Sequence, residues 1–180
     1  MREHQMDEVV DSTKLAGEAD ANSPAVPWLT EHEQMFWRAV LDAHRAVERL
    51  IDTQLLVSSD ISNADFSVLV VLSESDKQTM RMRELCEDLD WDRSRMSHQI
   101  TRMERRGLVE KIRCEKDNRG IDVHLTEHGR ELIERAAPGH VRAVRKVLFD
   151  TLHDIDLDAA MARYNAVAEA AHKLQAELRP

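Results

Sequence analysis

The sequence is poor in the residues that define several common protein classes. Its 180 residues include only two cysteines, Cys86 and Cys114, with five glycines, four prolines and 4% aromatic residues. Two cysteines exclude a disulfide framework and suit a reducing compartment. Because 42% of the residues are apolar and 33% are charged, while glycine and proline are scarce, we expect a mostly helical globular protein.

Long hydrophobic runs are also missing. No apolar stretch approaches the roughly 18 residues that a membrane-spanning helix needs. The first residues, MREHQMDEVVDSTK, are polar and do not resemble a signal peptide. These features predict a cytoplasmic protein that does not bind membranes. Residues 1–27 are polar and acidic and predict a flexible tail, while residues 28–180 predict a single domain.

Catalytic motifs are absent as well. The chain has nine histidines, but no GxSxG, HExxH, glycine-rich phosphate loop or paired-carboxylate pattern accompanies them. We therefore expect no enzymatic activity, no cofactor and no metal site. A protein that acts by binding a partner is therefore a better interpretation than an enzyme.

The charge of the chain is unevenly distributed. The formal net charge is −9, yet the segment 91–119 contains nine Lys/Arg against five Asp/Glu, which makes it +4 and leaves −13 elsewhere. An acidic protein does not coat nucleic acid indiscriminately. A basic patch on an acidic body is instead typical of a protein that recognises a DNA sequence.

The spacing of apolar residues predicts helices and then a hairpin. Recurrence at three and four residues indicates helices at about 30–57, from 62, at about 80–89, at 92–106, at 126–150 and at 156–178. Segment 73–79 is expected to be a turn, and Pro138-Gly139 to kink or break its helix. After Gly107, which we expect to end a helix, the period changes to two. Segments 109–114 and 121–125 therefore predict a β-hairpin with Asp117–Gly120 at its turn.

Polar residues are suitably placed to begin two of these helices. Ser62 with Asp65 forms a capping-box pattern, and the Asp92 carboxylate is placed to accept free backbone N–H groups of the helix that follows. In that helix Met96, Ile100 and Met103 share one side. The other sides are polar and basic, which is the pattern of a helix that packs on a core and faces DNA.

The order of elements indicates a winged helix-turn-helix: a mainly α fold with a small β-hairpin wing and further helices at both ends. The polar-faced helix then fits the major groove, and the hairpin lies beside the adjacent minor groove. Arg119 at the hairpin tip is the candidate minor-groove contact, and Asp117 is expected to hold it in place.

The segment LDWDRSRMSHQITRMERRGLVEKIRCEKDNRGIDVHLTEHG resembles the core of the MarR family of transcriptional regulators. Glu104, Gly107, Leu108 and Val109 match the end of the family's recognition helix. The wing pattern of the family is matched by Asp117, Arg119, Leu125, Thr126 and Gly129. The resemblance extends over about residues 30–178 and implies a homodimeric regulator, commonly a repressor, that binds a pseudo-palindromic double-stranded DNA operator. It also implies a small-molecule effector.

The resemblance implies roles for individual residues. The predicted DNA contacts are Arg93, Ser94, Arg95, Ser97, His98, Arg102, Asp117 and Arg119, although this face could also be a solvated surface. Arg105 and Arg106 are expected to form a charged rim. Residues 62–126 form the winged helix-turn-helix, and 28–58 with 127–180 the dimerisation helices. The predicted dimer contacts lie on a near-heptad stripe of Leu157, Met161, Tyr164 and Ala168. Candidate effector contacts are Phe36, Trp37, His44, Arg45 and Phe66, which could equally be core residues.

Two other functions remain open. One is a winged-helix metal or redox sensor that uses Cys86 or Cys114. The segment ELCEDL is similar to the cysteine motif of arsenic-type sensors, but Asp88 stands where a second thiolate is needed. The peroxide-sensing MarR branch has its reactive cysteine near the start of the first helix, where this chain has none. The other is a winged-helix interaction module that does not bind DNA.

Overall fold

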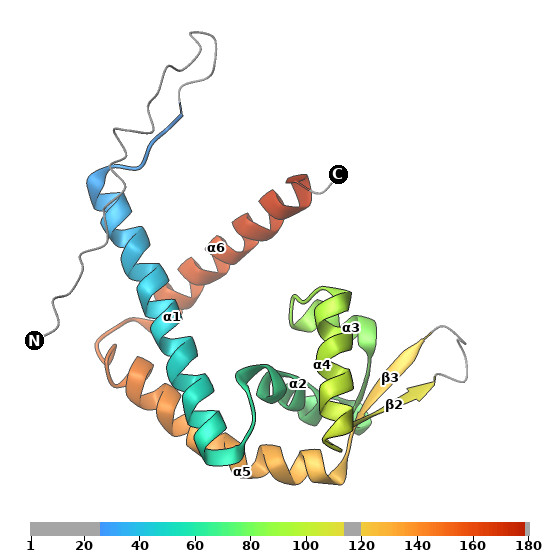
Figure 1. The fold of residues 1–180 in the computed structure, drawn as a ribbon. Coiled ribbons are helices and arrows are strands. Elements are labelled where there is room, and N and C mark those ends of the chain that lie inside the picture. The colour runs from blue at the N-terminus through green and yellow to red at the C-terminus, as the bar shows by residue number, and fades with distance from the viewer. Residues whose placement is uncertain (1–25, 114–119, 179–180) are drawn as a thin grey trace, which may run out of the picture. The chain divides into compact units, whose positions relative to one another are not determined.

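The computed structural model describes residues 26–113 and 120–178 (Figure 1). The chain divides into two units, 1–41 and 42–180, and the long helix α1 (Glu31–Ser59) passes from one to the other. Each unit is considered by itself. Most of the tail predicted at 1–27 lies outside the described residues.

In the first unit, Thr30 begins α1. Its hydroxyl accepts a hydrogen bond from the Glu33 backbone N–H at 3.3 Å, and the Glu33 carboxylate accepts one from the Thr30 N–H at 2.7 Å. The Thr30 hydrogen bonds lower the pKa of Glu33. Three large aromatic side chains are exposed here: Trp28, Phe36 and Trp37.

The second unit contains the remaining elements. They are the end of α1, α2 (Asn63–Glu74), a 3-10 turn (Asp76–Gln78), β1 (Thr79–Arg81), α3 (Met82–Asp88), α4 (Arg93–Arg105), β2 (Val109–Arg113), β3 (Ile121–Leu125), α5 (Glu127–Val144), a π-helical turn (Arg145–Phe149) and α6 (Leu157–Leu178). The predicted helices and the hairpin are therefore present.

The helix starts follow the predicted caps. The Ser62 hydroxyl accepts from the Asp65 N–H, and the Asp65 side chain accepts from the Ser62 N–H, which completes the capping box of α2. The Asp92 carboxylate accepts from the Arg95 N–H at 2.9 Å at the start of α4. Each contact satisfies a backbone N–H that has no partner within its helix.

The junction between α4, β2 and α5 depends on two glycines. Gly107 has a φ of 70° and ends α4 in the left-handed conformation, and the N–H groups of Gly107 and Leu108 return to the carbonyls of Glu104 and Met103. Gly129 packs against the Leu108 carbonyl so closely that a Cβ atom would overlap it. The Thr126 hydroxyl caps α5 and also donates to the Gly107 carbonyl at 2.6 Å.

The sheet has three antiparallel strands in the order β1-β3-β2, with Met80 opposite Val123 and Lys111 also opposite Val123. The sequence interpretation missed β1. It assigned Thr79 to a turn and Met80 to the next helix, because a three-residue strand shows no periodicity and exists only through its pairing with β3.

The hydrophobic core of the second unit is formed mainly by α2, α4, the sheet and the start of α5. Its largest fully buried side chains are Leu55, Ile61, Leu69, Leu72, Leu85, Met96, Ile100, Met103, Leu108 and Leu125. The predicted inner side of α4 is thus confirmed.

Helix α5 continues through Pro138, so of the predicted kink or break at Pro138-Gly139 the break is wrong. A proline removes one backbone hydrogen bond. Leu132, Ile133 and Ala136 of α5 are buried just before it, and this packing holds the helix in place.

Within residues 26–113 and 120–178, no single helix has both the length and the apolar composition to cross a membrane. Only α1 and α2 taken together, across a bend of 78°, satisfy those two criteria.

Candidate nucleic-acid interface

Helix α4 presents a polar surface on the side opposite the core. Arg93, Ser94, Ser97 and His98 are exposed on its first two turns. In the described part of the chain, none of these four side chains forms a hydrogen bond or an ion pair. Their donors and acceptors are therefore available to a ligand, on a helix whose other side is fixed by the core.

Arg95 differs from these four residues. Its guanidinium lies over the Trp91 ring, 4.1 Å from the ring centroid. The two residues line a pocket of about 460 Å³ together with residues of α1 and α2 that include Glu48 and Asp52. A cation over an indole face is held by the ring quadrupole, so Arg95 is directed toward the side of α4 nearest α1 and α2.

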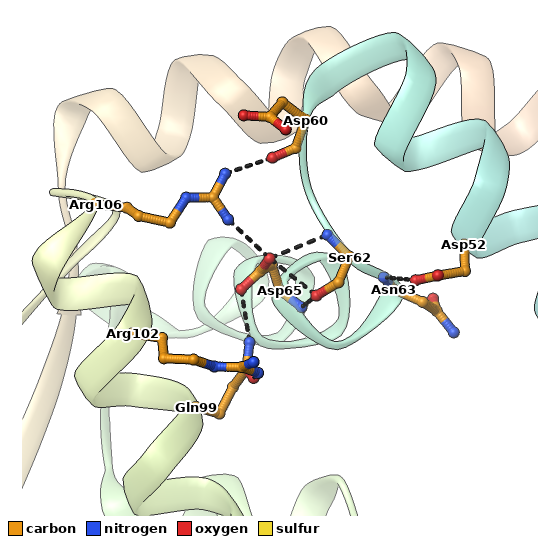
Figure 2. Close-up of polar contacts among 8 residues, drawn as sticks. All are labelled: Asp52, Asp60, Ser62, Asn63, Asp65, Gln99, Arg102 and Arg106. Carbon is orange, nitrogen blue, oxygen red and sulfur yellow. Dashed lines mark hydrogen bonds and ion pairs between the residues drawn. The ribbon is translucent and has the colours of Figure 1, made fainter.

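A buried carboxylate connects α4 to the start of α2 (Figure 2). Asp65 is 5% exposed and accepts hydrogen bonds from the Gln99 amide at 2.6 Å and the Arg106 guanidinium at 3.0 Å. Arg106 also donates to the Asp60 carbonyl. Arg105 and Arg106, the expected charged rim, are both exposed, but Arg106 also pairs with a carboxylate 41 residues away.

Arg102, a predicted phosphate contact, is exposed and belongs to the same cluster. Its guanidinium donates to the Gln99 carbonyl oxygen, so among the predicted DNA contacts that the structure describes it is the one whose side chain is hydrogen-bonded to a core residue.

The base of the wing is attached to α4. The Lys111 ammonium lies 2.9 Å from the Glu104 carboxylate and donates to the Thr101 hydroxyl at 2.9 Å. The hydrogen bond from Lys111 lowers the pKa of Glu104. The hairpin thereby lies beside α4 (Figure 1). Asp117 and Arg119, the two predicted contacts at its tip, lie outside the described residues.

A basic pocket that the sequence interpretation missed lies between α3, α4 and the wing. Its volume is about 610 Å³, and it is lined by residues that include Arg81, Arg83, Arg93, Ser97 and Gly120. Arg81 also pairs with Asp122 of β3 at 3.7 Å, and Arg83 with Glu87 at 3.4 Å. The two closely spaced arginines in Met-Arg-Met-Arg at 80–83 were the available signal.

Cys86 lines the same pocket but is largely buried and has a free thiol. Burial raises its pKa, which disfavours the reactive thiolate. Cys114 lies outside the described residues. Within the described ranges, no group of three or more His, Cys, Asp or Glu side chains is arranged to hold a metal ion.

The five candidate effector residues occupy different environments. Phe36 and Trp37 line a pocket of about 520 Å³ in the first unit with Leu29, His32 and Glu33. His44 and Arg45 are exposed and pair with Glu48 and Asp42 on their own helix. Phe66 is buried in the core, with its ring centroid 4.4 Å from that of His140.

Two buried polar atoms, one on α1 and one on α5, have no hydrogen-bond partner among the described residues. They are the Gln54 side-chain oxygen and His140 Nδ1, both buried. Burial lowers the pKa of His140. The sequence interpretation did not include Gln54 or His140 among the candidates, since they come from α1 and α5 and only the fold brings them near α2.

The stripe predicted for the dimer is exposed in the single chain. Leu157, Met161 and Tyr164 are 50%, 56% and 73% exposed, Ala168 is also exposed, and α6 has no buried residue among those described.

Comparison with solved structures identifies the family. Over 86% of this chain and 93% of the other, the fold matches Sco3205 of Streptomyces coelicolor, a MarR family transcriptional regulator in complex with DNA, with a TM-score of 0.72 and 34% identity. AbsC, a second MarR family regulator of that organism, matches with a TM-score of 0.75 and 36% identity over 84% of this chain and 99% of its own. The chain belongs to the MarR family of transcriptional regulators.

Two further similarities agree with membership of the MarR family. The family model of the SarA/Rot transcriptional regulators matches residues 49–136. The organic hydroperoxide resistance transcriptional regulator of Bacillus subtilis (strain 168) is 31% identical over 94 residues, or 51% of this chain. That match spans 63% of the length of the Bacillus protein.

Proposed function

We propose that this MarR family protein regulates transcription in the cytoplasm by binding an operator with α4 in the major groove. The observation that carries the proposal is the exposed surface of Arg93, Ser94, Ser97 and His98 on a helix that is capped at its start and buried along its other side. A helix of this width fits the major groove, where polar side chains reach base edges. The complex of the related Sco3205 with DNA supports the proposal.

The wing and the basic pocket extend this surface. Arg81 and Arg83 bring positive charge to the side of α4 next to the hairpin, where a DNA backbone that follows the major groove would pass. Arg119 at the wing tip is proposed to enter the adjacent minor groove and Asp117 to hold it, since narrow A·T-rich minor grooves attract arginine.

Homodimer formation is the second part of the proposal. Large apolar side chains are exposed in the first unit and along α6, among them Trp28, Phe36, Met161, Tyr164 and Leu178. Apolar exposure of this extent marks an interaction surface. A twofold dimer presents two recognition helices about one DNA turn apart, which suits a pseudo-palindromic operator.

A small-molecule effector is proposed to act near Phe66. Gln54 and His140 offer buried polar atoms without partners, and such atoms are costly unless a ligand or water satisfies them. Thermal unfolding in the presence of a panel of aromatic carboxylic acids and phenols tests this part. A compound that raises the unfolding temperature of the wild type, but not of His140→Phe, supports it.

The function itself is tested with a duplex that the wild-type protein selects from a randomised library. We expect Ser97→Ala and His98→Ala to reduce the preference for this duplex over a scrambled one, by about 1–3 kcal/mol for each good base contact. Arg135→Ala, on an exposed surface of α5, is the matched control and should leave the preference unchanged. Equal losses on both duplexes for Ser97→Ala and His98→Ala would show that these residues do not contact bases.

A further inference from the structure

The Asp65 cluster, which consists of Asp65, Gln99, Arg102 and Arg106, connects the turn between α1 and α2 to the surface of α4. Asp65 accepts four hydrogen bonds, from the Ser62 N–H and hydroxyl, from Gln99 and from Arg106. A buried carboxylate is tolerated only when it is well bonded. This one binds two side chains seven residues apart, Gln99 within α4 and Arg106 at its C-terminal cap.

Gln99 has a defined orientation within this cluster. It is 3% exposed, and its NH₂ group donates to the Asp65 carboxylate at 2.6 Å. Because a carboxylate accepts hydrogen bonds and only the nitrogen end of an amide can donate one, the carbonyl oxygen of Gln99 must point the other way. That oxygen accepts a hydrogen bond from the guanidinium of Arg102 (Figure 2).

We propose that Gln99 is a positioning residue that holds the Arg102 guanidinium ready for a DNA phosphate. The inference rests on the proposed function. Asp65 fixes the amide, the amide fixes Arg102, and Arg106 ties the same carboxylate to the Asp60 carbonyl in the α1–α2 turn. An arginine that is already held loses less side-chain freedom on binding, and the saving per ordered side chain corresponds to about two- to tenfold in affinity.

The test is a double-mutant cycle on the selected duplex, measured by fluorescence anisotropy. Gln99→Met keeps the shape of the side chain but cannot bond Arg102, and should weaken binding about two- to tenfold. Arg102→Ala should weaken it further. In the double variant, Gln99→Met should add no loss to that of Arg102→Ala, because its effect passes through the arginine.

A matched cycle separates this role from general support of α4. Arg105 is exposed on the same helix and, among the described residues, has no hydrogen-bonded or ionic partner. The fold losses in DNA affinity caused by Gln99→Met and by Arg105→Ala should therefore multiply in the double variant. Thermal unfolding curves of all variants identify a temperature at which every variant is folded, and binding is measured at that temperature. If Gln99→Met does not fold, Gln99→Asn, whose shorter amide cannot reach both partners, replaces it in the cycle.

The outcomes are distinct. A loss from Gln99→Met that persists in the Arg102→Ala background, or no loss at all, overturns the inference and leaves the proposed function intact. Failure of the Gln99 and Arg105 effects to multiply also overturns it, since Gln99 would then act on the whole helix. A wild-type protein that prefers no duplex overturns the proposed function, and the positioning role falls with it.

Discussion

His140 is an ionisable side chain placed against the core of the second unit. Its ring packs on Phe66, its Nδ1 is buried without a partner among the described residues, and burial lowers its pKa. The neutral ring is therefore the form that the fold favours. Protonation of His140 at mildly acidic pH should therefore destabilise the folded protein.

We expect the free energy of unfolding to decrease as the pH falls below 6.5, the ordinary value for histidine. Below pH 6.5 the His140 ring of the unfolded chain binds a proton more readily than that of the folded chain. The contribution of the neutral ring to the free energy of unfolding is therefore complete above pH 6.5 and is lost as the pH falls from 6.5 to the lowered pKa of the folded state. Urea unfolding of the wild type and of His140→Phe between pH 7.5 and 5 measures this. A variant whose stability declines as steeply as that of the wild type would contradict the assignment.

At the scale of elements, the attachment of α5 to the end of α4 depends on Gly129. We expect Gly129→Ala to destabilise the protein by about 1–3 kcal/mol, as for overpacked sites, because the new Cβ meets the Leu108 carbonyl of the backbone. Gly139→Ala is the matched control on α5. Its Cβ meets only the end of the Gln54 side chain at 2.5 Å, which can move. Equal losses for both variants in chemical unfolding would show that the contact with Leu108 is unimportant.

The elements that the sequence predicted correctly have local causes. Ser62 with Asp65, Asp92 and Gly107 act on backbone groups within a few residues, so their roles could be recognised without a fold. The strand Thr79–Arg81 and the Asp65–Arg106 pair could not be predicted in this way, because each depends on a partner about 40 residues away. Arg95 and Arg102 were predicted only as DNA contacts, although their partners Trp91 and Gln99 are just four and three residues away on the chain.

At the scale of the whole molecule, the proposed homodimer depends on burial of the exposed apolar stripe of α6 between two chains. Met161→Asp should weaken the dimer by about 3–5 kcal/mol, the cost of an unpaired buried charge. Ala170→Asp adds the same charge on the opposite side of the helix and is the control. Light scattering across a concentration series should show dissociation for Met161→Asp alone. A dimer that survives Met161→Asp unchanged would place the interface elsewhere.

The central claim, that a dimer recognises an operator through its basic surface, is tested most directly by the salt dependence of binding to the selected duplex. Each neutralised phosphate contributes about −0.9 to the slope of log affinity against log salt, so roughly six phosphates across two protomers predict a slope near −5. We expect this slope, two chains per duplex, and a preference over a scrambled duplex that persists as the salt concentration rises. A flat salt response, or equal affinity for both duplexes, would contradict the claim.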